Sequence, residues 1–174
     1  MSTNSKHASA ILGSPFSGST SEKIVKMIFD EFRQVGWTTE TIDLSQLDAS
    51  ALLIRNKDKG VEAALESVLN SDLIITASPT YRATYTGLLK VFLDQLPQDS
   101  LSGKLVLPVQ TGGSPEHSLS IEHGISPVMR SLGAIVLTNT IYAWSGQIKE
   151  DGAPSPEVTS AISASLKELI SLSN

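Results

Sequence analysis

The segment DLIITAS, residues 72–78, constrains the fold of this chain more than any other part of the sequence. Its apolar run is bounded by Asp72 and Pro79, and such a run is typical of a strand buried on both faces of a parallel sheet. Two parallel strands must be joined by a crossover connection, which is usually a helix. Apolar residues recur at helical spacing in three segments, 24–35, 61–69 and 88–96. The sequence therefore predicts an α/β protein.

Four further strands are predicted between the helices. They are ASAIL (8–12), WTTETIDL (37–44), KLVLPVQTGG (104–113) and AIVLTNTIYAW (134–144). Segment 37–44 alternates only partly between apolar and polar residues, which indicates an edge strand. Pro108 has no N–H to donate within its strand, so a bulge or an exposed side of the strand is expected there. Five strands alternating with helices imply a parallel sheet with helices on both faces.

Two more helices are predicted in the last third of the chain. Residues 118–132 carry one apolar stripe, but Gly124 and Pro127 interrupt it, so a kink or bulge is expected near His123. The final helix is predicted from about residue 156 to residue 172.

The composition limits the chemistry that the chain can perform. Its 174 residues fit one domain, residues 1–174. Cysteine is absent, which excludes disulfides, a thiol nucleophile and thiolate metal sites. The net charge of −5, without a cluster of basic residues, argues against nucleic acid as a partner. No apolar run could span a bilayer and the N-terminus MSTNSKHA has no signal-peptide core, so no membrane association and a cytoplasmic location are expected.

The loop after the first strand, GSPFSGST, is close to a phosphate-binding loop. Gly13 and Gly18 have the spacing of the two P-loop glycines, but Ser19 and Thr20 stand where Lys and Ser or Thr would be expected. A helix that begins here would add free N–H groups and the positive end of its dipole. These groups suit a single phosphate monoester better than a triphosphate, which usually needs a lysine and Mg²⁺. The loop therefore favours a mononucleotide such as FMN over ATP.

A purely structural interpretation of the same loop stays open. Ser19 could simply cap the helix, with Glu22 completing a capping box. The two functions can coexist, since the hydroxyls that could hold a phosphate belong to several residues, Ser14, Ser17, Ser19, Thr20 and Ser21.

Two other loops follow strands that should end at the same edge of the sheet, where α/β proteins bind ligands. The loop SPTYRATYTG carries four candidate residues for contact with a flat heterocycle, Pro79, Thr80, Tyr81 and Arg82. In the loop QTGGSPEHS, Gly112 and Gly113 carry no side chains and would allow a close approach to a ring edge. The alternatives are an ordinary strand-to-helix connection with a surface arginine, and a plain turn.

Other active-site types have little support in the sequence. The three histidines, His7, His117 and His123, are scattered and lack accompanying carboxylates, so no metal site is expected. The motif GxSxG of serine hydrolases does not occur, and neither does GxGxxG, which weakens a dinucleotide-binding interpretation of the first loop.

Three segments taken together resemble the NAD(P)H-dependent FMN reductases. They are GSPFSGSTSEKI (13–24), ASPTYRATYTGLLKVFLDQLP (77–97) and LVLPVQTGGSPEHSLSIEHGISPVMRSLGA (105–134). Within that family the chain is most similar to the flavin-supplying components of two-component alkanesulfonate and methanesulfonate monooxygenases. The resemblance implies a flavodoxin-like three-layer sandwich, with a five-stranded parallel sheet in the order 2-1-3-4-5.

The resemblance also implies a reaction and its participants. NADPH or NADH would reduce FMN, bound loosely or as a substrate, and reduced FMN would pass to a partner monooxygenase. No catalytic acid or base is implied, although Arg82 could assist by its charge. The cofactor-binding positions that match the family are Ser14, Ser19, Thr20 and Ser21 for the phosphate, Pro79, Thr80, Tyr81 and Arg82 along the flavin ring, and Thr111, Gly112, Gly113 and Ser114 near the ring edge and the nicotinamide.

The family further implies a homo-tetramer or homo-dimer. The helix at 88–96 agrees with association, because its apolar residues cover most of its circumference. The alternative is that this helix is buried within the monomer. The chain departs from the alkanesulfonate relatives in a shorter phosphate loop without their arginine. At His123 those relatives carry a tyrosine linked to a π-helical bulge, whereas the methanesulfonate relatives have a histidine there, as this chain does.

Two rival functions remain open at the level of sequence. One is a reductase of the same fold that keeps its flavin and reduces quinones, azo dyes or chromate. The other is a non-catalytic flavodoxin-like electron carrier or regulatory binding module, although an aromatic content of 5% gives it little support.

Overall fold

The strands form one parallel sheet. The computed structural model describes residues 5–149 and 152–172. The strand order is β2-β1-β3-β4-β5, and β6 also pairs with β4. The strand bounds are β1 His7–Leu12, β2 Thr38–Asp43, β3 Leu73–Pro79, β4 Leu105–Gly112, β5 Ile135–Val136 and β6 Ile141–Trp144. The predicted order 2-1-3-4-5 is therefore confirmed, with segment 37–44 as the expected edge strand.

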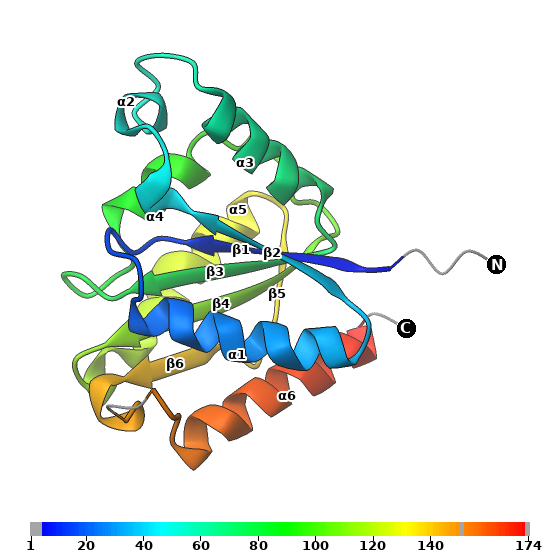
Figure 1. Cartoon of the computed structure of the whole chain (residues 1–174), viewed down its shortest axis with the longest axis vertical. Coiled ribbons are helices and arrows are strands. Elements are labelled where there is room, and N and C mark those ends of the chain that lie inside the picture. The colour runs from blue at the N-terminus through cyan, green and yellow to red at the C-terminus, as the bar shows by residue number, and fades with distance from the viewer. Residues whose placement is uncertain (1–4, 150–151, 173–174) are drawn as a thin grey trace.

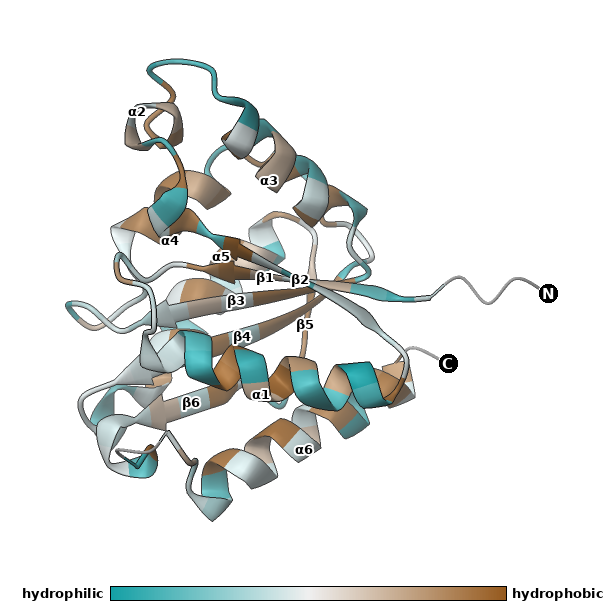
Figure 2. Cartoon of the chain, viewed as in Figure 1, coloured by the Kyte–Doolittle hydropathy of each residue, from teal (hydrophilic) through white to brown (hydrophobic). Residues whose placement is uncertain are grey.

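Helices cover both faces of the sheet (Figure 1). Helices α1 (Thr20–Gln34) and α6 (Pro156–Leu172) pack on one face. On the other face lie four helices, α2 (Ala49–Leu52), α3 (Lys59–Asn70), α4 (Gly87–Leu93) and α5 (Ser126–Ser131). The apolar stripes of α1 and α6 alternate with polar ones along each helix (Figure 2), as amphipathic helices on a sheet require. The predicted three-layer sandwich is thus observed. In the described chain no helix has the length and apolarity needed to cross a bilayer.

The last predicted strand, 134–144, is interrupted. Its ends form β5 and β6, and the residues between them leave the sheet. Helix α6 holds this excursion, because the hydroxyl of Ser165 donates to the Asn139 carbonyl at 2.6 Å. The Glu168 carboxylate accepts from the backbone N–H groups of Thr138 and Asn139, both at 2.7 Å.

Pro108 explains where the interruption falls. The N–H of Leu137 donates to the Val106 carbonyl at 2.9 Å, so the backbone polar groups of Val106 face β5. The backbone polar groups of successive residues point to opposite sides of a strand, so the backbone of Pro108, two residues on, also faces β5. Pro108 has no N–H to offer there, and pairing resumes only at Val109 with Ile141. The bulge expected at Pro108 therefore falls in the neighbouring strand, which leaves the sheet between β5 and β6. The expected exposed side is not observed, because Pro108 is buried.

The predicted helix over 118–132 has three parts. A 3₁₀ turn at Pro115–Leu119 leads into a π-helical turn at Ile121–Ile125, and α5 follows. The N–H of Ser126 donates to the Ile121 carbonyl, five residues back. The irregular turn precedes Pro127, which cannot donate to the carbonyl four residues before it. The bulge expected near His123 is confirmed.

Candidate flavin site at the carboxyl edge

The three predicted loops meet at the carboxyl edge of the sheet. A pocket of about 170 Å³ lies between them. Its lining comes from the start of α1, from the two loops after β3 and β4, and from the turn after β6: Thr20, Pro79, Thr80, Tyr81, Thr111, Gly112, Gly113 and Ser145. Ser145 is the one lining residue that the sequence did not predict. An ideal Cβ on Gly113 would meet no atom within 4 Å, so this part of the third loop has open space beside it.

The first loop ends in a capped helix. The Ser19 hydroxyl accepts from the Glu22 N–H at 3.3 Å, and the Glu22 carboxylate accepts from the Gly18 N–H at 2.6 Å. The capping alternative is therefore confirmed, although Glu22 reaches one residue further back than a capping box does. Lys26 pairs with Glu22 at 2.7 Å. This hydrogen bond from Lys26 lowers the pKa of Glu22 against the opposing effect of burial, and the Gly18 N–H lowers it further.

Three of the predicted phosphate-binding serines point into the loop's own structure. The Ser14 hydroxyl donates to the Phe16 carbonyl at 2.8 Å and accepts from the Phe16 N–H at 3.1 Å. The hydroxyls of Ser19 and Ser21 lie 3.1 Å apart. None of these three serines lines the pocket, and Thr20 is the one residue of the predicted phosphate group that does.

The second loop is a tight hairpin with Arg82 at its tip. Tyr81 and Thr84 exchange backbone hydrogen bonds of 2.8 and 3.3 Å. Arg82 and Ala83 between them have φ angles of 51° and 67°, as in a type I′ turn, where glycine and asparagine are usual. Arg82 is exposed and lies outside the pocket lining, while Pro79, Thr80 and Tyr81 are part of it.

Buried hydroxyls and backbone contacts tie the loops together. Thr86 caps α4 by accepting from the Leu89 N–H at 3.1 Å, and its hydroxyl donates to the Gly13 carbonyl in the first loop. The Thr80 N–H donates to the Thr111 carbonyl at 2.6 Å, which joins the second loop to the third. No sequence pattern predicts the role of Thr86, because a long-range hydroxyl contact leaves no periodic signal. The walls of the pocket are therefore fixed relative to one another.

The pocket offers dipoles rather than acid–base chemistry. Its lining has amides and hydroxyls, and Tyr81 is its one ionisable side chain among the described residues. Across residues 5–149 and 152–172 no group of three His, Asp or Glu side chains could hold a metal ion. Such a site can orient a ligand and stabilise charge, but it has no dyad for general acid–base catalysis.

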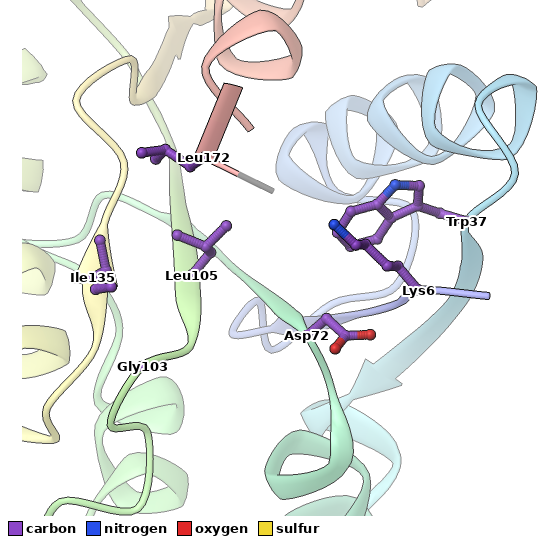
Figure 3. A pocket seen from close by; sticks show the side chains of 7 residues that line it. All are labelled: Lys6, Trp37, Asp72, Gly103, Leu105, Ile135 and Leu172. Atoms are coloured by element: carbon purple, nitrogen blue, oxygen red, sulfur yellow. The ribbon is translucent and has the colours of Figure 1, made fainter. Parts of the chain in front are cut away.

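A second pocket, of about 240 Å³, lies at the opposite edge of the sheet (Figure 3). It is lined by residues near the starts of the strands and the end of α6: Lys6, Trp37, Asp72, Gly103, Leu105, Ile135 and Leu172. The Lys6 ammonium lies 5.7 Å from the centre of the Trp37 ring. Ligands of parallel α/β sheets bind at the carboxyl ends of the strands, so this pocket is not the expected site.

The model of the family described as NADPH-dependent FMN reductase matches residues 8–148 of the chain. The chain belongs to this family. The resemblance proposed from the loop segments is thereby confirmed. An FMN reductase (NADPH) of Pseudomonas putida is 31% identical over 140 residues, which cover 80% of this chain and 71% of that enzyme. The Escherichia coli FMN reductase (NADPH) is 35% identical over 97 residues, 56% of this chain, and the match spans about half of that enzyme (51%).

Solved structures agree with the family assignment. The apo form of an NADH:FMN oxidoreductase, EMOB, superposes with a TM-score of 0.87 at 33% identity, covering 95% of this chain and 89% of that one. A Streptococcus pneumoniae flavodoxin superposes with a TM-score of 0.63 at 20% identity, covering 95% of this chain and 98% of that one. The second likeness concerns the fold alone and agrees with the predicted flavodoxin-like architecture.

Proposed function

We propose that this protein is an NAD(P)H:FMN oxidoreductase whose flavin site is the pocket at the carboxyl edge. The observation that carries the proposal is the meeting of three loops there, with the start of α1 on one side and Gly112 and Gly113 on the other. Membership of the FMN reductase family supports the choice of ligand.

The residues of the site fit FMN in chemistry. Thr20 and the first N–H groups of α1 would hold the phosphate monoester, with the hydroxyls of Ser14, Ser19 and Ser21 beside them. The ring would lie along Pro79–Tyr81, with its edge toward Thr111–Ser114. The open space beside Gly113 suits a flat ring that approaches the backbone closely.

The chain's own contribution to the reaction is orientation. Bound flavin and nicotinamide supply a hydride transfer that needs stacking and alignment more than a proton donor. The bond from Thr80 to Thr111 keeps the two ring-binding loops at a fixed separation. Backbone N–H groups of these loops would stabilise negative charge on the ring, and Arg82 at the hairpin tip would assist through its charge.

The proposal extends to the fate of the product. The first loop meets the phosphate without a lysine or arginine of its own, and Glu22 already occupies its Gly18 N–H. Both features lower the affinity for FMN, which suits an enzyme that releases reduced FMN to a partner monooxygenase. A sulfonate-type monooxygenase is the partner that the sequence resemblance favours.

Self-association is part of the same proposal. An apolar groove lies between α2 and α4, lined by Ala49, Leu52, Leu53, Gly87, Leu88 and Val91. Leu53 is 53% exposed and the adjacent Ile54 is 70% exposed. We assign this groove to a contact between copies of the chain, as a dimer or tetramer. Size-exclusion chromatography with light scattering tests the assignment by comparing the molar mass of the wild type with that of Leu53→Glu.

A steady-state assay on flavin-free protein tests the activity. Oxidation of NADH and of NADPH is measured with FMN, FAD and riboflavin as acceptors. We expect turnover with added FMN, and a higher KM for riboflavin because it lacks the phosphate. A protein that stays yellow and needs a second acceptor would instead be a flavin-retaining quinone, azo or chromate reductase. Absence of oxidation with every flavin would indicate an electron carrier or a binding module.

A further inference from the structure

The strand β6 provides a support for the third loop that the family resemblance did not identify. Tyr142 lies opposite Gln110 of β4, and its side chain extends along β4 past Gly112. A Cβ on Gly112 would lie 2.1 Å from the Tyr142 hydroxyl oxygen and 3.1 Å from its ring carbon Cζ. Real Cβ atoms do not approach other atoms at 2.1 Å, so the phenol can lie here only because residue 112 has no side chain.

The Tyr142 hydroxyl continues the strand pairing beyond the backbone. Pairing between β4 and β6 ends at Gly112 and Trp144. Past this point the Tyr142 hydroxyl donates to the Ser114 carbonyl at 2.6 Å. The Ser145 hydroxyl donates to the Gly113 carbonyl at 3.3 Å. Two side chains from the last strand and its following turn therefore hold two successive carbonyls of the loop.

These hydrogen bonds set the direction of the loop's peptide groups. A trans peptide places its N–H opposite its carbonyl, so fixing the Gly113 carbonyl also fixes the Ser114 N–H. Pro115 follows, with no N–H and a restricted φ angle, and it begins the 3₁₀ turn. Two hydroxyl donors thus hold the carbonyls of the loop at the proposed ring edge, and a proline restricts the backbone directly after it.

We propose that Tyr142 is a positioning residue for the flavin ring. Its hydroxyl would hold the loop Thr111–Ser114 in the conformation that meets the ring edge, without touching the ring itself. This inference rests on the proposed function, in which the ring lies along that loop.

The phenol is suited to act as a permanent donor. Burial raises the pKa of Tyr142, and the nearby negative charge of Glu116 raises it further. The hydroxyl therefore stays protonated throughout the neutral range and keeps its hydrogen bond to the Ser114 carbonyl.

The substitution Tyr142→Phe tests the proposal, because it keeps the ring over Gly112 and deletes only the donor. We measure dissociation constants of FMN and riboflavin by quenching of flavin fluorescence. We expect both dissociation constants to rise about three- to tenfold, which corresponds to the usual contribution of one hydrogen bond. The factor should be the same for both, since the loop faces the ring and not the phosphate. A general loss of stability would leave both dissociation constants unchanged at temperatures well below unfolding, so the titrations are run there and a thermal unfolding curve of the variant verifies that it is folded.

The matched control is Ser165→Ala. It also removes a hydroxyl-to-carbonyl bond of 2.6 Å, to Asn139, but from α6 and outside the pocket. We expect a lower unfolding temperature and wild-type flavin affinity. Should Tyr142→Phe fail to fold, Ser145→Ala removes the second donor, and the same equal rise is expected.

The outcomes separate this inference from the proposed function. Wild-type affinity for both flavins in Tyr142→Phe overturns the role of Tyr142, and the reductase function then stands on wild-type turnover of FMN. A rise for FMN alone also overturns it, because the effect would then lie at the phosphate. If the wild type neither binds nor reduces FMN, the proposed function fails and the inference fails with it.

Discussion

The carboxylate of Glu22 accepts a hydrogen bond from the backbone N–H of Gly18, with 2.6 Å between Oε2 and N. Gly18 belongs to the loop that we propose for the flavin phosphate, so the chain places its own anion on an N–H group that a phosphate would use. Lys26 pairs with Glu22 on its outer side, at 2.7 Å. In the absence of a ligand, the Glu22 carboxylate therefore stabilises the loop. A phosphate that binds here must approach this negative charge or displace it.

The substitution Glu22→Gln should tighten FMN binding. It removes the negative charge beside the phosphate position and keeps the size of the side chain. We expect the dissociation constant of FMN to fall about two- to tenfold, as for a charge near a helix N-terminus. Riboflavin should bind as it does to the wild type, because it has no phosphate. The matched control is Glu31→Gln, which removes an exposed charge from the same helix. Unchanged or weaker FMN binding in Glu22→Gln would contradict the proposed phosphate position.

Stability at acid pH should depend on Glu168. Burial raises the pKa of this carboxyl, but hydrogen bonds from Thr138 and Asn139 outweigh it, so the net pKa is lowered. Its folded pKa is then below its unfolded pKa, and the stabilisation is present at neutral pH and lost as the pH falls through the folded value. We expect Glu168→Gln to lower the free energy of unfolding by about 1 kcal/mol at pH 7, the lower end for bonds to a charged group because the site is partly exposed.

Urea unfolding at pH 7 and near pH 4 measures this effect. The difference in stability between Glu168→Gln and the wild type should shrink as the pH falls. The control Glu66→Gln changes an exposed side chain of α3 and should follow the wild type at both values. A constant difference across the pH range would mean that the ionised carboxylate is not what holds the excursion between β5 and β6.

Much of the fold could be predicted because its signals are local. The continuous apolar run of β3 and the helical spacing of α1, α3 and α4 placed these elements correctly. The glycine- and hydroxyl-rich loops pointed to one edge of the sheet, and the structure brings residues from all three into one pocket. Parallel pairing converts such a pattern into a position, because all strands end at the same edge.

What could not be predicted depends on contacts between distant residues. Pro108 affects not its own strand but the neighbouring one, which breaks into β5 and β6. Ser145 and Tyr142 reach the third loop only after β6 has paired with β4, so neither has a local signature. The serines of the first loop were predicted as ligands, yet Ser14 and Ser19 are engaged in the loop's own hydrogen bonds.

The charge of Arg82 should matter for ligand binding rather than for folding. Its side chain is exposed at the hairpin tip, so Arg82→Ala should leave the unfolding temperature nearly unchanged. We expect KM for FMN or for NAD(P)H to rise several-fold, as for loss of one partly exposed ionic contact of roughly 1 kcal/mol. Arg55→Ala removes an exposed arginine elsewhere and should keep wild-type kinetics. Identical kinetics in the two variants would refute a role for Arg82.

Two adjacent glycines of the third loop, Gly112 and Gly113, should differ in their response to substitution by alanine. At Gly112 a Cβ would lie 2.1 Å from the Tyr142 hydroxyl oxygen, whereas at Gly113 it would meet no atom within 4 Å. Gly112→Ala must push the phenol off the loop, which we expect to cost about 1–3 kcal/mol of stability by overpacking. Gly113→Ala should be as stable as the wild type. Its methyl group should narrow the open side of the pocket, so we expect the dissociation constant of FMN to rise. Thermal unfolding and FMN titration of both variants measure this, and equal stability of the two would show that the phenol can move aside freely.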